Sequence, residues 1–318
     1  MKSTFELVDG SIIPSAGGRI DVDVYVAPGE DEKREIAGVI GLDPHDIESA
    51  LDPDEISRVQ FYPEGVYVIW KRPKNLSVDQ RLRLDVTSAG LFYNRGMLHV
   101  IMGESGIPFS AKEFQGVSST VDVLLKFFLH TVHHYLDHLK AIKQLTVDLE
   151  SKISTSMENR YLLQMFALGE ALIYYLNAIE ANGSTLAKVR ASAEKLGLTK
   201  EQIEMLDDII LDNFQCAKQA QIFTTVLSGL MDARGTIVNN NVNVLLKNLT
   251  LINIIFLPLN LIASIGGMSE FSAFTKSVGW KISYSLFSLG MVLLGWATWV
   301  VLVRAIDKKQ RAESRIKR

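Results

Sequence analysis

A heptad pattern of polar and small residues runs along one face of a helix predicted near the C-terminus. The steps between these positions alternate between four and three residues. The second half of this seam lies in a stretch hydrophobic enough to cross a membrane, where polar groups facing lipid are costly. Copies of the helix around an axis would turn the seam inward, so the pattern predicts a pore lining. The seam comprises Asp232, Thr236, Asn239, Asn243, Leu246, Thr250, Asn253, Leu257, Asn260, Ser264 and Gly267.

Two membrane spans are predicted at the C-terminus, at roughly 249–268 and 281–303. Each has the length needed to cross about 30 Å of hydrocarbon. The only charged residues of the connecting loop are Glu270 and Lys276, whereas the tail 304–318 contains seven basic residues. The positive-inside rule therefore places the tail in the cytoplasm. Because two spans return the chain to one side, both termini are expected to be cytoplasmic, with the protein in the cell inner membrane.

The region before the spans reads as an α/β segment, 1–117, followed by a helical stalk, 118–248. A helix is expected to begin near Pro44. Strands are expected at Arg19–Val26, Gly65–Lys71, Arg81–Val86 and Met97–Met102.

The stalk shows amphipathic stretches at 121–153, 158–180 and 184–196. Thr199 then resembles a fresh N-cap, with Glu201 and Gln202 in the next turn. No proline follows until Pro258, so an unbroken helix from Lys200 to Met268 would be about 100 Å long.

Composition limits the remaining possibilities. Residues 1–245 carry 33 acidic and 23 basic side chains, which gives an acidic body ahead of the basic tail. Such a distribution favours cations as ligands of the body and lipid headgroups as partners of the tail, and it gives no reason to expect nucleic acid. Cys216 is the single cysteine, so no disulfide can form within the chain. No catalytic constellation or cofactor motif is found, so neither an enzyme nor a bound cofactor is expected.

Histidines and aspartates provide two further candidate sites. His130, His134 and His138 fall at i, i+4 and i+8 of one predicted helix, a spacing compatible with Zn²⁺ or Ni²⁺. The alternative, which we favour, is a solvated polar stripe without metal. Asp208 lies on the long helix and is a candidate metal ligand between subunits. Asp232, at the start of the seam, is the better candidate for a ring of carboxylates that attracts cations.

The sequence around the seam resembles the CorA family of divalent-cation channels, which carries the pattern N-x-x-M-K-x-L-T, then F-x-P-L-T, then I-A-G-x-Y-G-M-N. Here the corresponding runs begin at Asn243, Phe256 and Ile262. The resemblance implies a funnel-shaped homopentamer: an α/β domain, long stalk helices, a first span that lines the pore and a second that surrounds it. It also implies that Asp232 gates the pore and that Asp208 senses cytoplasmic metal, whose binding between subunits would hold the pore shut.

The outer mouth departs from the family pattern. The chain has Gly267-Met268-Ser269 where the family has Gly-Met-Asn, and Gly266 where it has an aromatic residue. A serine ring would fit hydrated Mg²⁺ less well, because its side chain is shorter and can also donate a hydrogen bond. The expected function is therefore divalent-cation transport, with Mg²⁺, Zn²⁺, Co²⁺ and Ni²⁺ left open. The histidines and the lost asparagine lean toward a transition metal, as in the zinc-transporting ZntB branch. The alternative is a poorly selective pore or a membrane-bound regulatory or stress protein.

Overall fold

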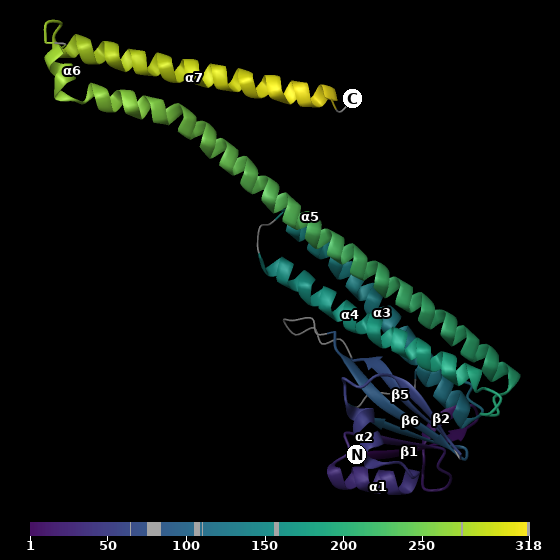
Figure 1. The fold of residues 1–318 in the computed structure, drawn as a ribbon. Helices are drawn as coiled ribbons and strands as arrows, with labels where there is room; N and C mark the ends of the chain where they lie inside the picture. Colours follow the sequence, from purple (N-terminus) through teal and green to yellow (C-terminus); the bar gives the residue numbers. More distant parts are fainter. Residues whose placement is uncertain are drawn as a thin grey trace. The chain divides into compact units, whose positions relative to one another are not determined.

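The computed structural model describes residues 1–63, 65–74, 84–104, 109, 111–155, 159–274 and 276–316 (Figure 1). The chain forms two compact units, an N-terminal unit of Met1–Met231 and a C-terminal unit of Asp232–Arg318. The expected segments 1–117 and 118–248 therefore do not form separate compact units, because the helices that follow the sheet share its core.

A seven-stranded sheet lies at the centre of the N-terminal unit, with the strand order β2-β1-β3-β7-β6-β5-β4. Strands β3 and β7 pair in parallel, and the other neighbouring strands pair antiparallel. The strands are β1 (Lys2–Val8), β2 (Ser11–Pro14), β3 (Val22–Val26), β4 (Arg58–Tyr62), β5 (Gly65–Pro73), β6 (Val86–Asn94) and β7 (Met97–Met102).

The strand predictions were right for β7 and for the start of β5, and early for β3. Strand β3 begins at Val22, and the carboxylate of the preceding Asp21 accepts hydrogen bonds from the Leu7 N–H at 2.9 Å and from Arg19 Nε at 2.7 Å. Of the predicted strand Arg81–Val86, residues 81–83 lie outside the described residues, and β6 begins only at its last residue.

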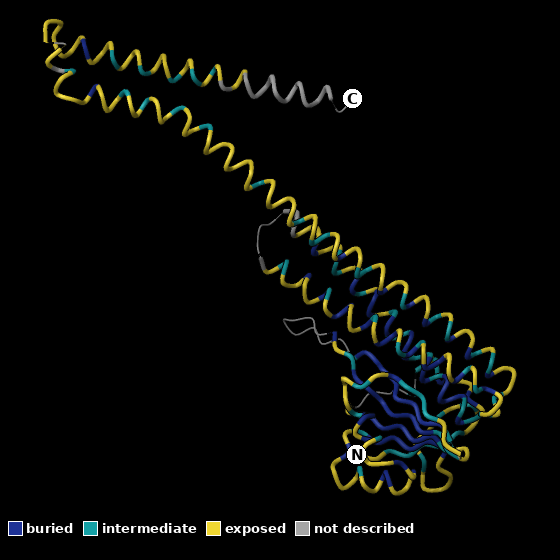
Figure 2. Tube along the Cα trace, in the orientation of Figure 1, coloured by how far each residue is buried: buried dark blue, intermediate teal, exposed yellow. Residues whose placement is uncertain are grey.

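Helices cover both faces of the sheet. On one face, α1 (Glu30–Ile40) and α2 (Pro44–Leu51) bury Ile36, Ile47 and other apolar side chains against Ile69 and Ile101. As predicted, α2 begins at Pro44, and the Asp43 side chain caps it by accepting the His45 N–H at 2.9 Å. The other face is covered by long helices, which share a hydrophobic core with the sheet. Figure 2 shows the buried segments of the strands and of these helices in dark blue.

The long helices are α3 (Thr120–Thr155), α4 (Asn159–Ala191) and α5 (Lys200–Gly266), and the short helix η1 (Lys112–Phe114) precedes them. The predicted interruption between residues 180 and 184 was wrong, since α4 is continuous there. Between the two predicted stretches, Asn182 hydrogen-bonds to Lys71 of β5, and Gly183 lies close to the Asn213 side chain. Residue 158, the expected start of this helix, lies outside the described residues.

The start of α5 is fixed by the predicted cap. The Gln202 N–H donates to Thr199 Oγ1 at 3.3 Å, and the Thr199 N–H donates to Gln202 Oε1 at 3.0 Å, which forms a capping box. Gln202 Nε2 also donates to Asp122 Oδ1 at 2.7 Å, and Asp122 in turn caps the first turn of α3. The beginnings of α3 and α5 are thereby joined.

The C-terminal unit contains the remainder of α5, the short helix α6 (Ser269–Phe274) and α7 (Trp280–Ile316). Helix α5 continues through Pro258, as the unbroken-helix prediction required. The predicted second span lies within α7, which extends past residue 303. Helix α6 was not predicted, because its six residues, SEFSAF, are too short to show a period.

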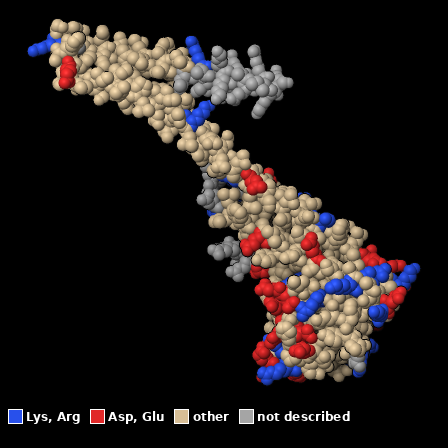
Figure 3. Space-filling model, viewed as in Figure 1, with Lys and Arg blue, Asp and Glu red and all other residues tan. Residues whose placement is uncertain are grey.

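By length and composition alone, α5, α7 and α4 contain segments apolar enough to cross a membrane. The three differ in burial. Within the protein, 39% of the apolar window of α4 is buried, against 6% for α5 and 0% for α7. Helix α4 thus places much of its apolar surface in the core of the N-terminal unit. The two predicted spans leave theirs exposed, and Figure 3 shows few charges on the visible face of the C-terminal unit.

Candidate pore helix and outer mouth

The seam residues of the predicted span lie exposed on α5. Asn243, Leu246, Thr250, Asn253, Leu257, Asn260 and Ser264 are all exposed in the isolated chain. Two seam threonines donate to the helix itself: Thr236 Oγ1 to the Asp232 carbonyl at 3.1 Å and Thr250 Oγ1 to the Leu246 carbonyl at 2.8 Å. Their hydroxyl protons are therefore satisfied, and their oxygen lone pairs remain available along the seam.

Helix α7 contacts a different face of α5. The more buried positions on this part of α5 are Leu251, Ile255, Leu259, Ile262 and Gly266. At 3.6 residues per turn, the middle of this face lies about 170° from the middle of the seam. The polar seam thus points away from α7. This is the arrangement needed if the seam faces a central axis and α7 lies outside it.

The C-terminal end of α5, where the outer mouth is predicted, is followed after two residues by α6. The Gly267 N–H donates to the Ala263 carbonyl at 3.0 Å and the Met268 N–H to the Ile265 carbonyl at 3.2 Å, so both residues close the last turn. Ser269 is then the first residue of α6, and its hydroxyl donates to Glu270 Oε2 at 3.2 Å. The structure therefore places a carboxylate beside Ser269 at the predicted mouth, a feature that sequence reasoning did not use.

The two acidic candidates are both exposed. Asp208 lies on α5 in the N-terminal unit and Asp232 opens the C-terminal unit, and neither forms an ion pair with a described residue. Their neighbour Asp207 differs, because both of its carboxylate oxygens accept hydrogen bonds from Arg190, at 2.6 and 3.1 Å. This bidentate contact lowers the pKa of Asp207 and occupies it, which leaves Asp208 as the free carboxylate of the pair.

The three histidines share one face of α3, as the spacing predicted, but their surroundings are those of a core. His138 is buried and its Nδ1 lies 2.7 Å from the Tyr175 hydroxyl, while His130 and His134 are half-buried. Burial lowers the pKa of His138 to about 4, and burial together with the charge of the neighbouring His138 lowers the pKa of His134 to about 4. The solvated stripe that we favoured is therefore wrong.

The metal alternative gains no support from these positions. Within the described part of the chain, no group of three or more His, Cys, Asp or Glu side chains is placed to hold a metal ion. The rings contact one another and aromatic neighbours instead: the ring centroids of His134 and His138 are 4.4 Å apart, and those of His130 and Phe114 are 5.7 Å apart.

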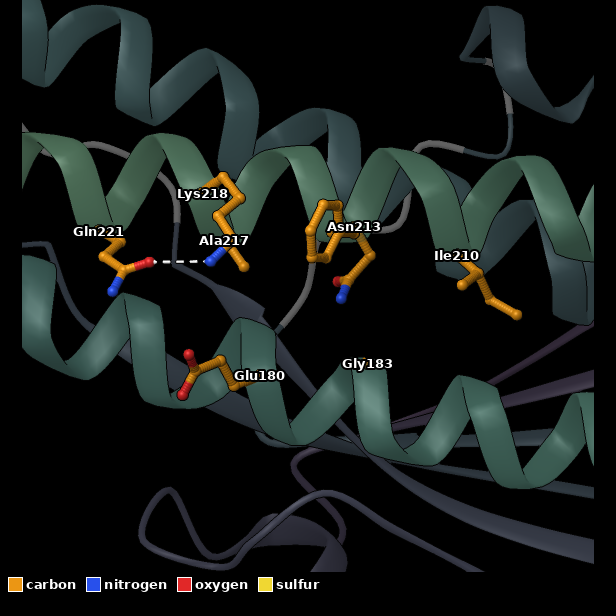
Figure 4. A pocket seen from close by; sticks show the side chains of 8 residues that line it. Glu180, Gly183, Ile210, Asn213, Ala217, Lys218 and Gln221 are labelled. Carbon is orange, nitrogen blue, oxygen red and sulfur yellow. Dashed lines mark hydrogen bonds between the residues drawn. The ribbon is translucent and has the colours of Figure 1, made fainter.

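A cavity of about 270 Å³ lies between α4 and α5 in the N-terminal unit (Figure 4). Asn213 reaches from α5 toward α4, and its Nδ2 donates to the Ile179 carbonyl at 3.0 Å. Lys218 is held by Gln221 at 3.2 Å. None of the predicted site residues lines this cavity. Its lining residues are Glu180, Gly183, Ile210, Asn213, Phe214, Ala217, Lys218 and Gln221.

Comparison with known proteins gives the same assignment over most of the chain. The family described as "CorA-like Mg2+ transporter protein" matches residues 24–304. The chain is 24% identical over 277 residues to the cobalt/magnesium transport protein CorA of Methanocaldococcus jannaschii, which covers 82% of this chain and 86% of that protein. It is 22% identical over 289 residues to the protein of the same name from Thermotoga maritima, with coverages of 88% and 80%.

Solved structures show the same fold. The complete CorA magnesium transporter from Methanocaldococcus jannaschii matches with a TM-score of 0.77 at 20% identity, covering 95% of this chain and 96% of that one. The full-length CmaX protein matches with a TM-score of 0.70 at 10% identity, with the same coverages. The predicted fold, an α/β domain with long helices and a C-terminal helical pair, is therefore confirmed.

Proposed function

Because the chain belongs to the CorA-like Mg²⁺ transporter family, we propose that it conducts divalent metal cations across a cell membrane, along the seam of α5. One observation carries the proposal for this chain: the polar seam is exposed and lies opposite the face that α7 contacts. A helix that merely anchored the protein would have no reason to keep these polar side chains together within an apolar segment.

The proposed assembly is a homopentamer in the inner membrane. Around a fivefold axis, the seam of each α5 would face its copies, α7 would form an outer ring, and the apolar surfaces of both helices would face lipid. The basic tail favours a cytoplasmic C-terminus, and two spans then place the N-terminal unit in the cytoplasm as well. In support, the helices with the least buried apolar windows are α5 and α7.

Two aspartates would couple the cytoplasmic cation concentration to the pore. A ring of Asp232 carboxylates at the inner end of the seam would concentrate cations. Exposed Asp208 would bind metal together with a neighbouring subunit, and metal binding would favour the closed state to the extent that its affinity for that state is higher. Its availability supports this role, since Asp207 beside it is already bound to Arg190.

Ion selection would begin at the outer mouth formed by Gly267, Met268 and Ser269. The Ser269 hydroxyl donates to Glu270, so the mouth would present carboxylate oxygens close to the hydroxyl ring. Such a mouth would attract divalent ions without reproducing the amide ring of the family pattern. We therefore propose transport of Mg²⁺ together with Co²⁺, Ni²⁺ or Zn²⁺. The altered mouth also supports the alternative of a poorly selective pore or a regulatory membrane protein.

The membrane potential supplies the driving force for uptake. One charge gains about 2.3 kcal/mol per 100 mV, so a divalent cation gains about twice that on entering a cell with a negative interior. A conducting pore of this kind needs no further energy source.

The test is ion flux into proteoliposomes that contain the purified protein and an internal metal-sensitive dye, with Mg²⁺, Zn²⁺, Ni²⁺ and Co²⁺ supplied in turn. The blocked variant is Asn243→Leu with Asn260→Leu. The matched control, Asn241→Leu with Asn248→Leu, makes the same change about half a turn away on the same helix. Flux that the seam pair abolishes and the control pair retains supports the proposal. Flux equal in the two variants, or no flux of any ion from an intact oligomer without cytoplasmic metal, contradicts it.

A further inference from the structure

Gly266, the last residue of α5, is covered by an aromatic ring from the second span. A Cβ atom on Gly266 would lie 2.5, 2.8 and 3.0 Å from Cζ, Cε1 and Cε2 of Phe287 on α7. Real Cβ atoms do not come so close to a ring, so Phe287 occupies the space that any side chain at 266 would need. Gly266 is one of the few buried positions in the C-terminal unit as described, although it lies at the end of its helix.

Two further aromatic residues complete this contact. The Phe271 ring on α6 lies 5.3 Å from that of Phe287 and 6.0 Å from that of Tyr284, measured between centroids. The Tyr284 hydroxyl donates a hydrogen bond to the Gly266 carbonyl at 3.3 Å. That carbonyl belongs to the last turn of α5, where backbone acceptors have no partner within the helix. Helix α7 thus contacts the end of α5 at Gly266, and α6 joins this contact through the Phe271 ring.

We infer that Phe287, Tyr284 and Phe271 form an aromatic clasp that positions the outer mouth for ion selection. The family pattern places an aromatic side chain at the position of Gly266; in this chain the second span supplies the ring instead. The inference rests on the proposed function, because it treats Gly267, Met268 and Ser269 as the mouth. Phe287 and Tyr284 are positioning residues, since neither belongs to the seam.

The reason for a clasp lies in the local sequence. Gly266 and Gly267 are both poor helix formers, so the last turn of α5 has little intrinsic tendency to hold its shape. The mouth residues follow directly, and selection among divalent ions depends on the spacing of oxygen ligands around an ion that holds its water tightly. The clasp restrains this turn from outside through a hydrogen bond to its backbone and a ring against its α-carbon.

The first experiment measures ion preference in proteoliposomes for Phe287→Ala and for Leu289→Ala. Leu289 lies two positions along α7, is 59% exposed, and serves as the matched control. We expect Phe287→Ala to keep flux but to reduce the preference among Mg²⁺, Co²⁺, Ni²⁺ and Zn²⁺ by roughly tenfold, because residues in contact are energetically coupled. Leu289→Ala should keep the wild-type preference. An unchanged preference in Phe287→Ala would overturn the inference while leaving the transport proposal intact.

A second variant separates a specific contact from general damage. Gly266→Tyr alone should impair ion preference, because its Cβ would collide with Phe287. Gly266→Tyr combined with Phe287→Ala should recover much of it, since the new ring could occupy the vacated space. A double variant no better than the worse single variant would show that Phe287 does not act through this position.

A third measurement does not depend on transport. A cysteine introduced as Ser269→Cys would be labelled with a membrane-impermeant maleimide in intact vesicles, with and without Phe287→Ala. The native Cys216 is buried in the N-terminal unit, and burial raises its thiol pKa to about 12, so it should contribute little signal. We expect severalfold faster labelling when the clasp is removed. Equal rates would contradict the clasp even if the protein proved not to conduct ions.

Discussion

Replacing Asn182 by Leu would remove the hydrogen bonds that join α4 to the sheet. Asn182 Oδ1 accepts from the Ser57 hydroxyl at 2.6 Å and from the Lys71 N–H at 3.1 Å, and Nδ2 donates to the Lys71 carbonyl at 2.8 Å. Strand β4 pairs with β5 only as far as Ile69, so this amide satisfies the backbone groups that a longer β4 would have met. Asn182, Ser57 and Lys71 are all buried.

The size of the effect follows from the groups left without partners. Leucine has a similar volume and no polar atom, so it would exclude water from the site while leaving the Lys71 N–H and carbonyl unpaired. Each buried, unsatisfied group costs about 1–3 kcal/mol, and the Ser57 hydroxyl can rotate elsewhere, so the loss should be roughly 2–6 kcal/mol in the free energy of unfolding. For a unit of this size, such a loss lowers the melting temperature by roughly 5–20 °C.

Thermal melting of the purified full-length protein would measure this effect, with Asn177→Leu as the control. Asn177 lies on the same helix but is exposed, so that substitution should change the melting temperature of the N-terminal unit by only about 1–2 °C. Similar melting temperatures for the two variants would refute the argument that the Asn182 amide completes the edge of β5.

Three further predictions concern other parts of the chain. Gly183→Ala should destabilise the protein by about 1–3 kcal/mol, because its Cβ would lie 2.8 Å from Asn213 Nδ2. Gly229→Ala has open space around it and should instead stabilise α5 by about 0.5–1 kcal/mol. Thermal melts that rank the two variants in the opposite order would contradict this account. Buried His138 has a pKa of about 4 in the folded state against 6.5 in the unfolded state, so the unfolded chain binds the proton first as the pH falls. The stability contributed by neutral His138 is therefore present above pH 6.5 and is lost as the pH falls toward 4. His138→Gln should flatten the fall in melting temperature over that range, and an unchanged slope would argue against this role. Ser269→Asn, which restores the family motif, should raise Mg²⁺ flux relative to Ni²⁺ and Co²⁺ in proteoliposomes if the pathway is intact, whereas a vestigial pore would show no response.

The sequence was most informative where a single period persists over many residues. The seam and the unbroken α5 could be read directly, because a heptad step has little meaning outside a helix. The start of α2 and the cap at Thr199 were also predictable, since capping depends on residues only a few positions apart.

The elements that were missed depend on distant partners. Helix α1 contains six charged residues among eleven, and only three of its side chains are buried, so its apolar face is short. Strands β1 and β2 owe their place to pairing with each other and with β3 rather than to alternation in their own sequences. Likewise, the histidine stripe was misread because the spacing shows which face the rings share but not that Tyr175 lies against it.

The candidate site was likewise predictable only in part from the sequence. Which residues belong to the seam followed from the sequence, but their position opposite α7 required the fold. The ring of Phe287 contacts Gly266 across two helices that α6 separates in the sequence. A glycine in place of the family's aromatic residue gave no indication of which residue would supply a ring there.

The burial of α4 has a consequence for topology mapping. Among the residues that the structure describes, three helices are long and apolar enough to cross a membrane, and an odd number of crossings would place the two ends of the chain in different compartments. Because α4 shares its core with the sheet, the candidate crossings that remain in the proposed topology are α5 and α7, an even number. Reporter fusions at the N- and C-termini should therefore give the same compartment signal, and a reporter inserted between α6 and α7 should give the opposite one.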